Sequence, residues 1–323
     1  MSDPTLQATQ AVTEVERQLA QPDVATDNKR TFGQWFRHLG WRHVVGVVAA
    51  LYAAFPILYI ISASLSSGGT LLGSNKLFAS VSACNYLALG GAHPGDCPVP
   101  HSTGSFWLWF ANTLIIASVT AIATVLLASA AAYAFSRFRF AGRRAGLTFL
   151  LVIQIFPQML AFIAIYLLLL RLGEAVPVLG LDSRLALILI YLGGALGSNA
   201  FLMYGFFNSI PKELDESAKV DGATHAQTYW LIIMPLVTPI IAVVALLSFI
   251  TTVGEFIIAR LVLPSETHQT AAVGLYGWVS DELSASWGQF AAGAVVTAAP
   301  VLLLFLFLQR YIVSGLTAGA VKG

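Results

Sequence analysis

The segment from Pro211 to Pro239 reads PKELDESAKVDGATHAQTYWLIIMPLVTP and lies between long apolar runs. Six charged side chains fall between Lys212 and Asp221, although only 10% of the 323 residues are charged. A charged, helix-forming island of this kind is a poor membrane span. It is instead suited to docking a soluble partner at a membrane surface.

The composition around this segment is that of a membrane protein. Hydrophobic residues make up 57% of the chain, and the mean hydropathy is +0.76. Charged residues in soluble domains reach roughly a quarter of the sequence. A net charge of +1, with basic residues scattered among loops, also argues against nucleic-acid binding, which requires a concentrated basic patch. We therefore expect an all-α polytopic membrane protein.

Apolar runs long enough to cross a bilayer occur about six times. A helix needs about 20 apolar residues to span the hydrocarbon core, where unpaired backbone groups find no partner. The predicted spans cover about 43–64, 107–135, 147–170, 184–207, 232–256 and 289–311. Residues 1–42 are predicted to be a flexible tail that includes an interfacial helix near Thr31–Arg42, and residues 43–323 the transmembrane domain.

Basic residues predict how these spans are oriented. They concentrate before the first span, between the second and third, between the fourth and fifth, and after the last. The positive-inside rule therefore places both termini in the cytoplasm. Loops 66–105 and 260–287 are then external, whereas loop 208–231 and the tail 315–323 are cytoplasmic.

The first external loop contains both cysteines of the chain, Cys84 and Cys97. On the oxidising side of a membrane such a pair is compatible with a disulfide, but an even pair does not require one. A disulfide and two free thiols both remain open.

Polar residues inside the third and fourth spans are candidates for a solute pathway. Gln154, Pro157 and Gln158 lie near the middle of the third span, where the proline interrupts the helical hydrogen bonds. Either a kinked helix lines a polar path, or neighbouring helices satisfy these groups. Asn199 follows the small residues of the fourth span, which favour close helix packing over a substrate contact.

Glu255 is the carboxylate that falls within an apolar run. An ionisable residue inside a span is a functional candidate, because a central charge costs about 3 kcal/mol on insertion scales. Counting from Leu236 places Glu255 near the outer rim, where water or Arg260 would accommodate it. A structural role and a place in the pathway are both retained.

Motifs for soluble chemistry are missing from the sequence. It contains no Gly-x-x-x-x-Gly-Lys-Ser/Thr phosphate loop, no His-Glu-x-x-His and no Cys-x-x-Cys. We expect no catalytic residues, no metal site and no bound cofactor, so the chain is not expected to hydrolyse ATP by itself.

Local helix rules predict an elbow within the charged segment. Ser209 is a plausible helix cap with Pro211 in the first turn, and Gly222 supplies the backbone freedom that ends the helix. Thr224 and Gln227 have capping-box spacing for a second helix. Pro235 and Pro239 are expected to bend the inner end of the fifth span.

The pattern Glu216-Ser217-Ala218-x-x-Asp221-Gly222-Ala223, followed by Met234-Pro235, resembles the Glu-Ala-Ala…Gly…Leu-Pro loop of ATP-binding-cassette (ABC) importer permeases. Ser217 stands where alanine is usual, and Met234 where leucine is usual. The resemblance implies a type I importer permease fold whose coupling helices fit a cleft of the ATPase subunit. The residues expected at that contact are Glu216, Ser217, Ala218, Asp221, Gly222, Ala223 and Pro235.

Residues 45–323 resemble more specifically the smaller permease subunit of maltose/maltodextrin importers, through segments such as 132–140 (AYAFSRFRF) and 315–323 (GLTAGAVKG). The resemblance implies that the tail enters the interface between two ATPase subunits. It also implies that Tyr276 and Trp278 lie in a loop facing the sugar-binding protein. The tail residues concerned are Leu316, Thr317, Ala318, Gly319 and Lys322.

The resemblance implies a complex in the plasma (inner) membrane of a prokaryote. This chain would pair with a second permease subunit, two ATP-binding subunits that bind ATP and Mg, and an extracytoplasmic sugar-binding protein. Maltose and maltodextrins are the expected cargo, with trehalose or another small solute as the alternative. A cation-coupled secondary carrier is disfavoured because the spans are nearly free of charge, and a membrane-embedded enzyme because no convergent catalytic set exists.

Overall fold

The structure is a computed structural model that describes residues 36, 40–66, 77–78, 80–91, 97, 105–155, 158–280 and 286–320, and no side chains at 158, 159 or 313–320. Over these residues the regular secondary structure is helical. The chain divides into two units, residues 1–57 and 58–323. The predicted all-α fold is confirmed for the described part. Most of the predicted tail and interfacial helix lies outside it.

In the first unit, the described residues form most of helix α3 (Trp41–Ser64). Its large side chains, including Leu51 at 66% exposure and Tyr52 at 84%, are not covered by other residues of the unit. Within this unit, an apolar helix with uncovered side chains is the expected form of a membrane span.

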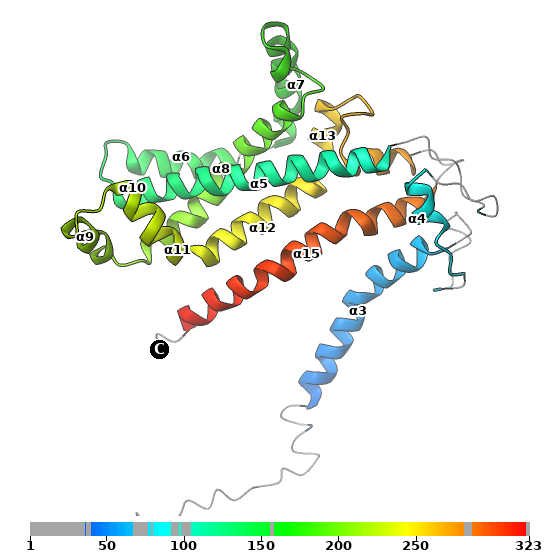
Figure 1. The fold of residues 1–323 in the computed structure, drawn as a ribbon, viewed down its shortest axis with the longest axis horizontal. Helices are drawn as coiled ribbons and strands as arrows, with labels where there is room; N and C mark the ends of the chain where they lie inside the picture. Colours follow the sequence, from blue (N-terminus) through cyan, green and yellow to red (C-terminus); the bar gives the residue numbers. More distant parts are fainter. Residues whose placement is uncertain are drawn as a thin grey trace, which may run out of the picture. The chain divides into compact units, whose positions relative to one another are not determined.

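Three long helices form the core of the second unit (Figure 1). Helix α5 (Phe106–Arg137) packs against α8 (Arg184–Asn208) and α12 (Thr238–Gly254). The buried face of α5 carries small residues such as Ala117, Ala128 and Ala132, which allow close approach of neighbouring helices. Helix α15 (Trp287–Ala320) packs against α12 and the short helix α4 (Cys84–Leu89).

Two spans are broken rather than continuous. Helix α6 (Arg143–Ile155) and α7 (Gln158–Ala175) are bent from one another by 102°, on either side of the predicted Pro157 kink. Pro157 and the side chain of Gln158 are not among the parts of the chain that the structure describes. The segment ending in α11 (Met234–Leu236) is bent by 79° from α12, and Pro235 and Pro239 lie in the first turns of these two helices. The described part therefore holds four full-length spans, or six if each bent pair is one span.

Short helices occupy the predicted loops. The connection 260–287 contains the end of α13 (Ile257–Val262) and all of α14 (Ala271–Gly277), and the 3₁₀ turn η3 (Pro177–Leu179) precedes α8. The charged segment contains α9 (Glu213–Val220), α10 (His225–Gln227) and the π-helix η4 (Thr228–Ile233). In Figure 1, α9 and α10 lie at one end of the long helices, whereas α4 and α13 lie toward the other.

Candidate functional site

The charged segment forms the predicted helix, glycine elbow and second helix. Helix α9 ends at Val220, and Gly222, two residues later, has a φ of +82°, in the left-handed region that glycine adopts without a Cβ penalty. Gly222 N donates to Lys219 O at 3.0 Å, and Ala223 N donates to Ala218 O at 2.9 Å. Together these bonds satisfy the last carbonyls of α9.

The second helix begins with the predicted capping box. Gln227 N donates to Thr224 Oγ1 at 3.3 Å, and Thr224 N donates to Gln227 Oε1 at 2.8 Å. Ser209, however, does not cap α9, because α8 continues to Asn208 and the Ser209 hydroxyl bonds back to Phe206 O at 2.7 Å. Helix α9 instead starts after Lys212, without a side-chain cap.

Most of the predicted coupling residues are exposed on α9 and the elbow. Glu216, Ser217, Asp221 and Gly222 face outward, whereas Ala218 is 4% exposed and packs inside the chain. Asp215, one helical turn before Ala218, is also buried. These two residues define the inward face of α9. Ala223 is half-buried, and Pro235 lies in the first turn of α11.

The inward face of α9 is held to α5 by a buried ion pair that we did not predict. Arg137 Nε lies 2.9 Å from Asp215 Oδ2, and the two side chains are 5% and 11% exposed. Arg137 Nη2 also donates to Ile210 O at 3.2 Å. The sequence signal for this attachment was that Asp215 and Ala218, three residues apart, fall on the same face of α9.

Three of the predicted pathway residues line a single open cavity of about 1180 Å³ between α6, α8 and α12: Gln154, Asn199 and Glu255. Gln154 Nε2 donates to Gly194 O at 3.4 Å. A Cβ at Gly197 would lie 2.4 Å from that Gln154 nitrogen, so the glycine allows α6 to approach α8. This agrees with the packing role expected for the small residues of the fourth span.

Polar groups follow one wall of the cavity from Asn199 to Glu255. Asn199 Nδ2 donates to Ser248 Oγ at 3.4 Å. Ser248 and Glu255, which are seven residues apart in sequence, both line the cavity. Hydroxyls at Thr251 and Thr252 lie between them, each bonded to a backbone carbonyl one turn earlier. The cavity is therefore apolar with one polar stripe, which is suited to a hydroxyl-rich solute or to a facing helix.

Glu255 has partners other than the predicted Arg260. Its carboxylate accepts hydrogen bonds from Ile258 N at 2.8 Å and Ala259 N at 2.9 Å, and the Tyr191 hydroxyl donates to it at 2.5 Å. The carboxylate thus satisfies the first amides of α13. The Arg260 guanidinium instead lies over the Tyr276 ring, 5.3 Å from its centroid.

The opposite end of α5 holds the predicted binding-protein-facing segment. Trp109 Nε1 and Asn112 Nδ2 donate to backbone carbonyls of residues 266–269 at 2.8–3.0 Å. Ala271 N donates to Thr113 Oγ1 at 2.7 Å, and Arg184 Nη1 donates to Asn112 Oδ1 at 2.9 Å. A single helix therefore contacts α9 at one end and the start of α14 at the other.

The two aromatic residues assigned to this segment have different environments. Trp278 is half-buried and packs on Phe106 and Trp109, with ring centroids 6.2 and 5.5 Å away, against the edge of the core. Tyr276 is 43% exposed and is the more accessible of the two rings to an external partner.

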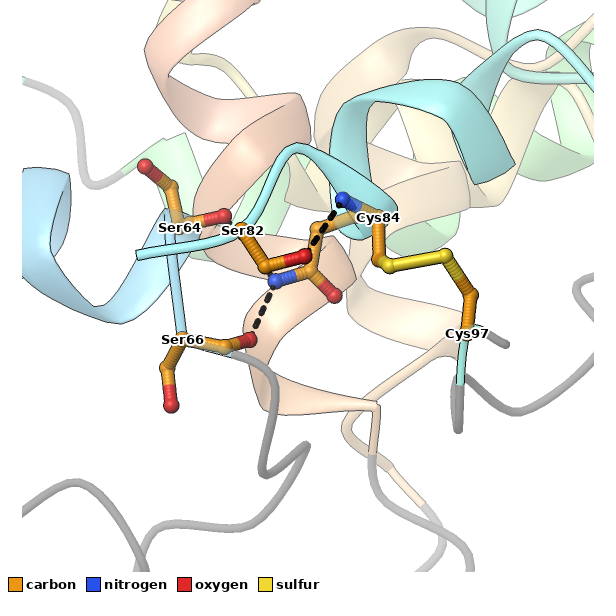
Figure 2. The surroundings of a disulfide bond; sticks show 6 residues. Ser64, Ser66, Ser82, Cys84 and Cys97 are labelled. Carbon is orange, nitrogen blue, oxygen red and sulfur yellow. Dashed lines mark hydrogen bonds between the residues drawn. A yellow bond between two sulfur atoms is a disulfide. The ribbon is translucent and has the colours of Figure 1, made fainter. Parts of the chain in front are cut away.

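Cys84 and Cys97 form a disulfide with their Cα atoms 5.6 Å apart (Figure 2). Cys84 begins α4, and Cys84 N donates to Ser82 Oγ at 3.2 Å. The neighbouring Asn85 is 1% exposed and donates to Ser64 O and Ser66 O, which ties α4 to the end of α3. The bridge therefore closes residues 84–97 into a covalent loop within the segment between α3 and α5.

The tail assigned to the ATPase interface is described only in part. The α15 backbone is helical through residues 316–320, which include Leu316, Thr317, Ala318 and Gly319. Lys322 and the side chains of the other tail residues lie outside the description. Their predicted contact remains a prediction.

Comparison with known proteins identifies the family. Residues 124–317 match the family described as "Binding-protein-dependent transport system inner membrane component". The chain is 40% identical over 279 residues to the maltose/maltodextrin transport system permease protein MalG of Vibrio vulnificus (strain YJ016), covering 83% of this chain and 90% of that protein. It is 36% identical over 274 residues to the galactooligosaccharides transport system permease protein GanQ of Bacillus subtilis (strain 168), covering 85% and 92%.

A solved structure gives the same fold. A bacterial ABC transporter that imports the acidic polysaccharide alginate matches with a TM-score of 0.67 and 25% identity, over 87% of this chain and 99% of that chain. The helical spans and the sequence relatives agree. The chain belongs to the binding-protein-dependent transport system inner membrane components, and is a multi-pass inner-membrane permease subunit of a bacterial ABC sugar importer.

Proposed function

We propose that this chain imports maltose and maltodextrin-type oligosaccharides as one of two permease subunits in an ATP-driven complex. The carrying observation is the α9–Gly222–α10 elbow in a chain 40% identical to a maltose/maltodextrin permease over most of its length. A maltodextrin permease of Bacillus subtilis, MdxG, is also 41% identical over 215 residues, covering 67% of this chain and 75% of that protein.

The proposed complex contains two ATP-binding subunits on the cytoplasmic side, which bind ATP and Mg. The exposed residues Glu216, Ser217 and Asp221 contact an ATPase subunit, and closure of the two ATPases moves the elbow. Helix α9 follows the end of α8 and contacts the end of α5. Its motion therefore tilts these spans and exchanges inward for outward access.

On the external side, the proposed partner is a sugar-binding protein that releases its cargo at the α14 end. The exposed Tyr276 ring is available there, on a segment held in place by α5. The sugar then passes along the cavity lined by Asn199, Ser248 and Glu255, with the second permease completing the far wall.

Galactooligosaccharides are the second candidate cargo, favoured by the 36% identity to GanQ. The two are separated by reconstituting the complex and measuring which sugar-loaded binding protein stimulates ATP hydrolysis. We expect maltose or maltotriose to stimulate, and galactobiose not to. Stimulation by galactobiose alone would replace the maltodextrin assignment.

A further inference from the structure

Helix α9 has two faces with different environments. The outward face carries exposed residues such as Glu216 and Val220, the latter 88% exposed. The inward face carries the two buried residues, Asp215 and Ala218. Any force applied by a soluble partner acts on the first face, and its effect on the spans depends on how firmly the second face is attached.

Arg137 provides that attachment at two points. Its Nε lies 2.9 Å from Asp215 Oδ2 on α9, and its Nη2 donates to Ile210 O at 3.2 Å, just before α9. The Nη2 contact is a hydrogen bond, whereas the Nε–Oδ2 contact is a close ion pair without hydrogen-bond geometry. The pair is also nearly dry, so removing either partner leaves a buried charge without compensation.

The chain joins α9 to α8 through residues 209–212, where Arg137 contacts Ile210 O, and to α10 through the elbow, which is less suited to transmitting force. Gly222 has no side chain, is exposed, and a Cβ built on it meets no atom within 4 Å. Glycine permits wide backbone rotation. A push on α9 therefore passes more directly through Arg137 into α5 than through the elbow into η4.

Helix α5 in turn reaches the opposite end of the unit. Its 32 residues span about 48 Å at 1.5 Å per residue. Near its start, Trp109, Asn112 and Thr113 hold residues 266–271 by hydrogen bonds. The helix therefore connects the two segments that the proposed function assigns to soluble partners.

We propose that the buried Arg137–Asp215 pair is the mechanical coupling between the ATPase-facing helix α9 and the spans, so that α9 and α5 move as one rigid body. This inference rests on the proposed ATP-driven import. Arg137 and Asp215 are positioning residues, which act by transmitting displacement rather than by contacting the sugar or the nucleotide.

The rigid-body claim is tested by distance measurement, without any sugar. Spin labels are placed on Val220→Cys in α9 and Leu127→Cys in α5, both exposed. Both native cysteines are in the disulfide, so they do not react. In the assembled complex we expect the same distance with and without ATP. A change of ~5 Å, the pitch of one helical turn, would overturn the claim.

The coupling claim is tested by sugar uptake per ATP hydrolysed in proteoliposomes, with maltose as the probe. Asp215→Asn and Arg137→Lys should assemble but lower this ratio by about tenfold, within the usual range of allosteric coupling. The charge-swapped variant Arg137→Asp/Asp215→Arg should recover most of it. Equal ratios in wild type and single variants, or no recovery in the swap, would overturn the claim.

A matched control is the exposed Arg171–Glu174 pair on α7, with an N–O distance of 3.6 Å and exposures of 82% and 69%. Glu174→Gln should leave the ratio unchanged, because exposed pairs contribute little. Should wild type take up no maltose, the proposed cargo fails while the distance measurement still decides the rigid-body claim. If the single variants do not assemble, assembly and uptake of the charge-swapped variant decide the coupling claim, and the wild-type distances decide the rigid-body claim.

Discussion

The hydroxyl of Tyr191 on α8 donates a hydrogen bond to the Glu255 carboxylate, at the point where α12 ends and α13 begins. The same carboxylate accepts the amides of Ile258 and Ala259. A charge that looked like a pathway candidate is therefore also the cap of a short helix. Its two roles separate experimentally, because capping affects stability and a pathway role affects uptake.

Glu255→Gln is expected to lower the thermal midpoint of the solubilised protein. The glutamine amide keeps one oxygen acceptor but replaces the other with an NH₂ group. A backbone N–H of Ile258 or Ala259 then faces a donor and has no acceptor, at a cost of about 1–3 kcal/mol. Tyr191→Phe removes one hydrogen bond to the carboxylate and should cost about 1.5–3 kcal/mol. Thermal unfolding monitored by tryptophan fluorescence measures both. An unchanged midpoint for Glu255→Gln would contradict the capping role.

Gly222→Val is expected to weaken association with the ATPase subunit while leaving membrane insertion intact. The φ of +82° costs a non-glycine residue about 1–2 kcal/mol, and a β-branched one more, although space for the side chain is available. Co-purification of the ATPase subunit with tagged permease reports the loss. Gly46→Val is the matched control, since Gly46 also has no atom within 4 Å of an added Cβ and lies inside α3.

The gap between those two valine variants is the informative result. Because the room within this chain is similar, a difference reports the left-handed backbone of Gly222 together with its place at the predicted ATPase contact. If both variants bind the ATPase subunit as wild type does, the elbow does not depend on the left-handed glycine.

Acid sensitivity is expected at the junction between α8 and the α13–α14 connection. Partial burial raises the pKa of the Asp182 carboxyl, but hydrogen bonds from Ser265 and His268 outweigh this effect and the pKa is lowered. A carboxyl whose pKa is lower in the folded state stabilises the fold above its unfolded pKa. That contribution is lost as the pH falls below about 4 and through the folded pKa.

Asp182→Asn should therefore remove part of the loss of stability in acid and lower stability at neutral pH. Thermal midpoints of both proteins between pH 7 and pH 3 provide the measurement. Glu174→Gln, which alters an exposed carboxylate, should keep the wild-type slope. Identical slopes for Asp182→Asn and wild type would show that this carboxyl does not carry the effect.

The disulfide permits a test of orientation. In intact cells, a membrane-impermeant maleimide should label Cys84 and Cys97 only after treatment with a reductant, because both thiols are bonded and lie in the predicted external segment. Labelling without reductant would contradict the disulfide. Protection after reduction in intact cells, with labelling after lysis, would reverse the predicted orientation.

Local and compositional features were predictable from the sequence. The six apolar runs, the glycine elbow and the Thr224–Gln227 capping box each depend on residues close in sequence, so their physics is visible without a fold. The break of the fifth span at Pro235 and Pro239 belongs to the same class.

Partners distant in sequence were not predictable in this way. In the sequence, Arg137 was recognised only as one of the basic residues that indicate membrane orientation. Its pairing with Asp215 depends on how α9 folds back onto α5. Trp278 looked available to a sugar but packs on Trp109, where Gly274 leaves room: a Cβ there would lie 2.1 Å from the Trp109 ring. Such contacts follow from helix packing, which periodicity alone does not specify.

The most direct test of the central claim is maltose uptake by proteoliposomes that contain this chain, the second permease and the ATPase subunits, with binding protein outside and ATP inside. The account predicts uptake that requires ATP and binding protein together, and that falls when Gly222 is replaced by valine. Uptake driven by an ion gradient without ATP, or no dependence on the binding protein, would contradict it.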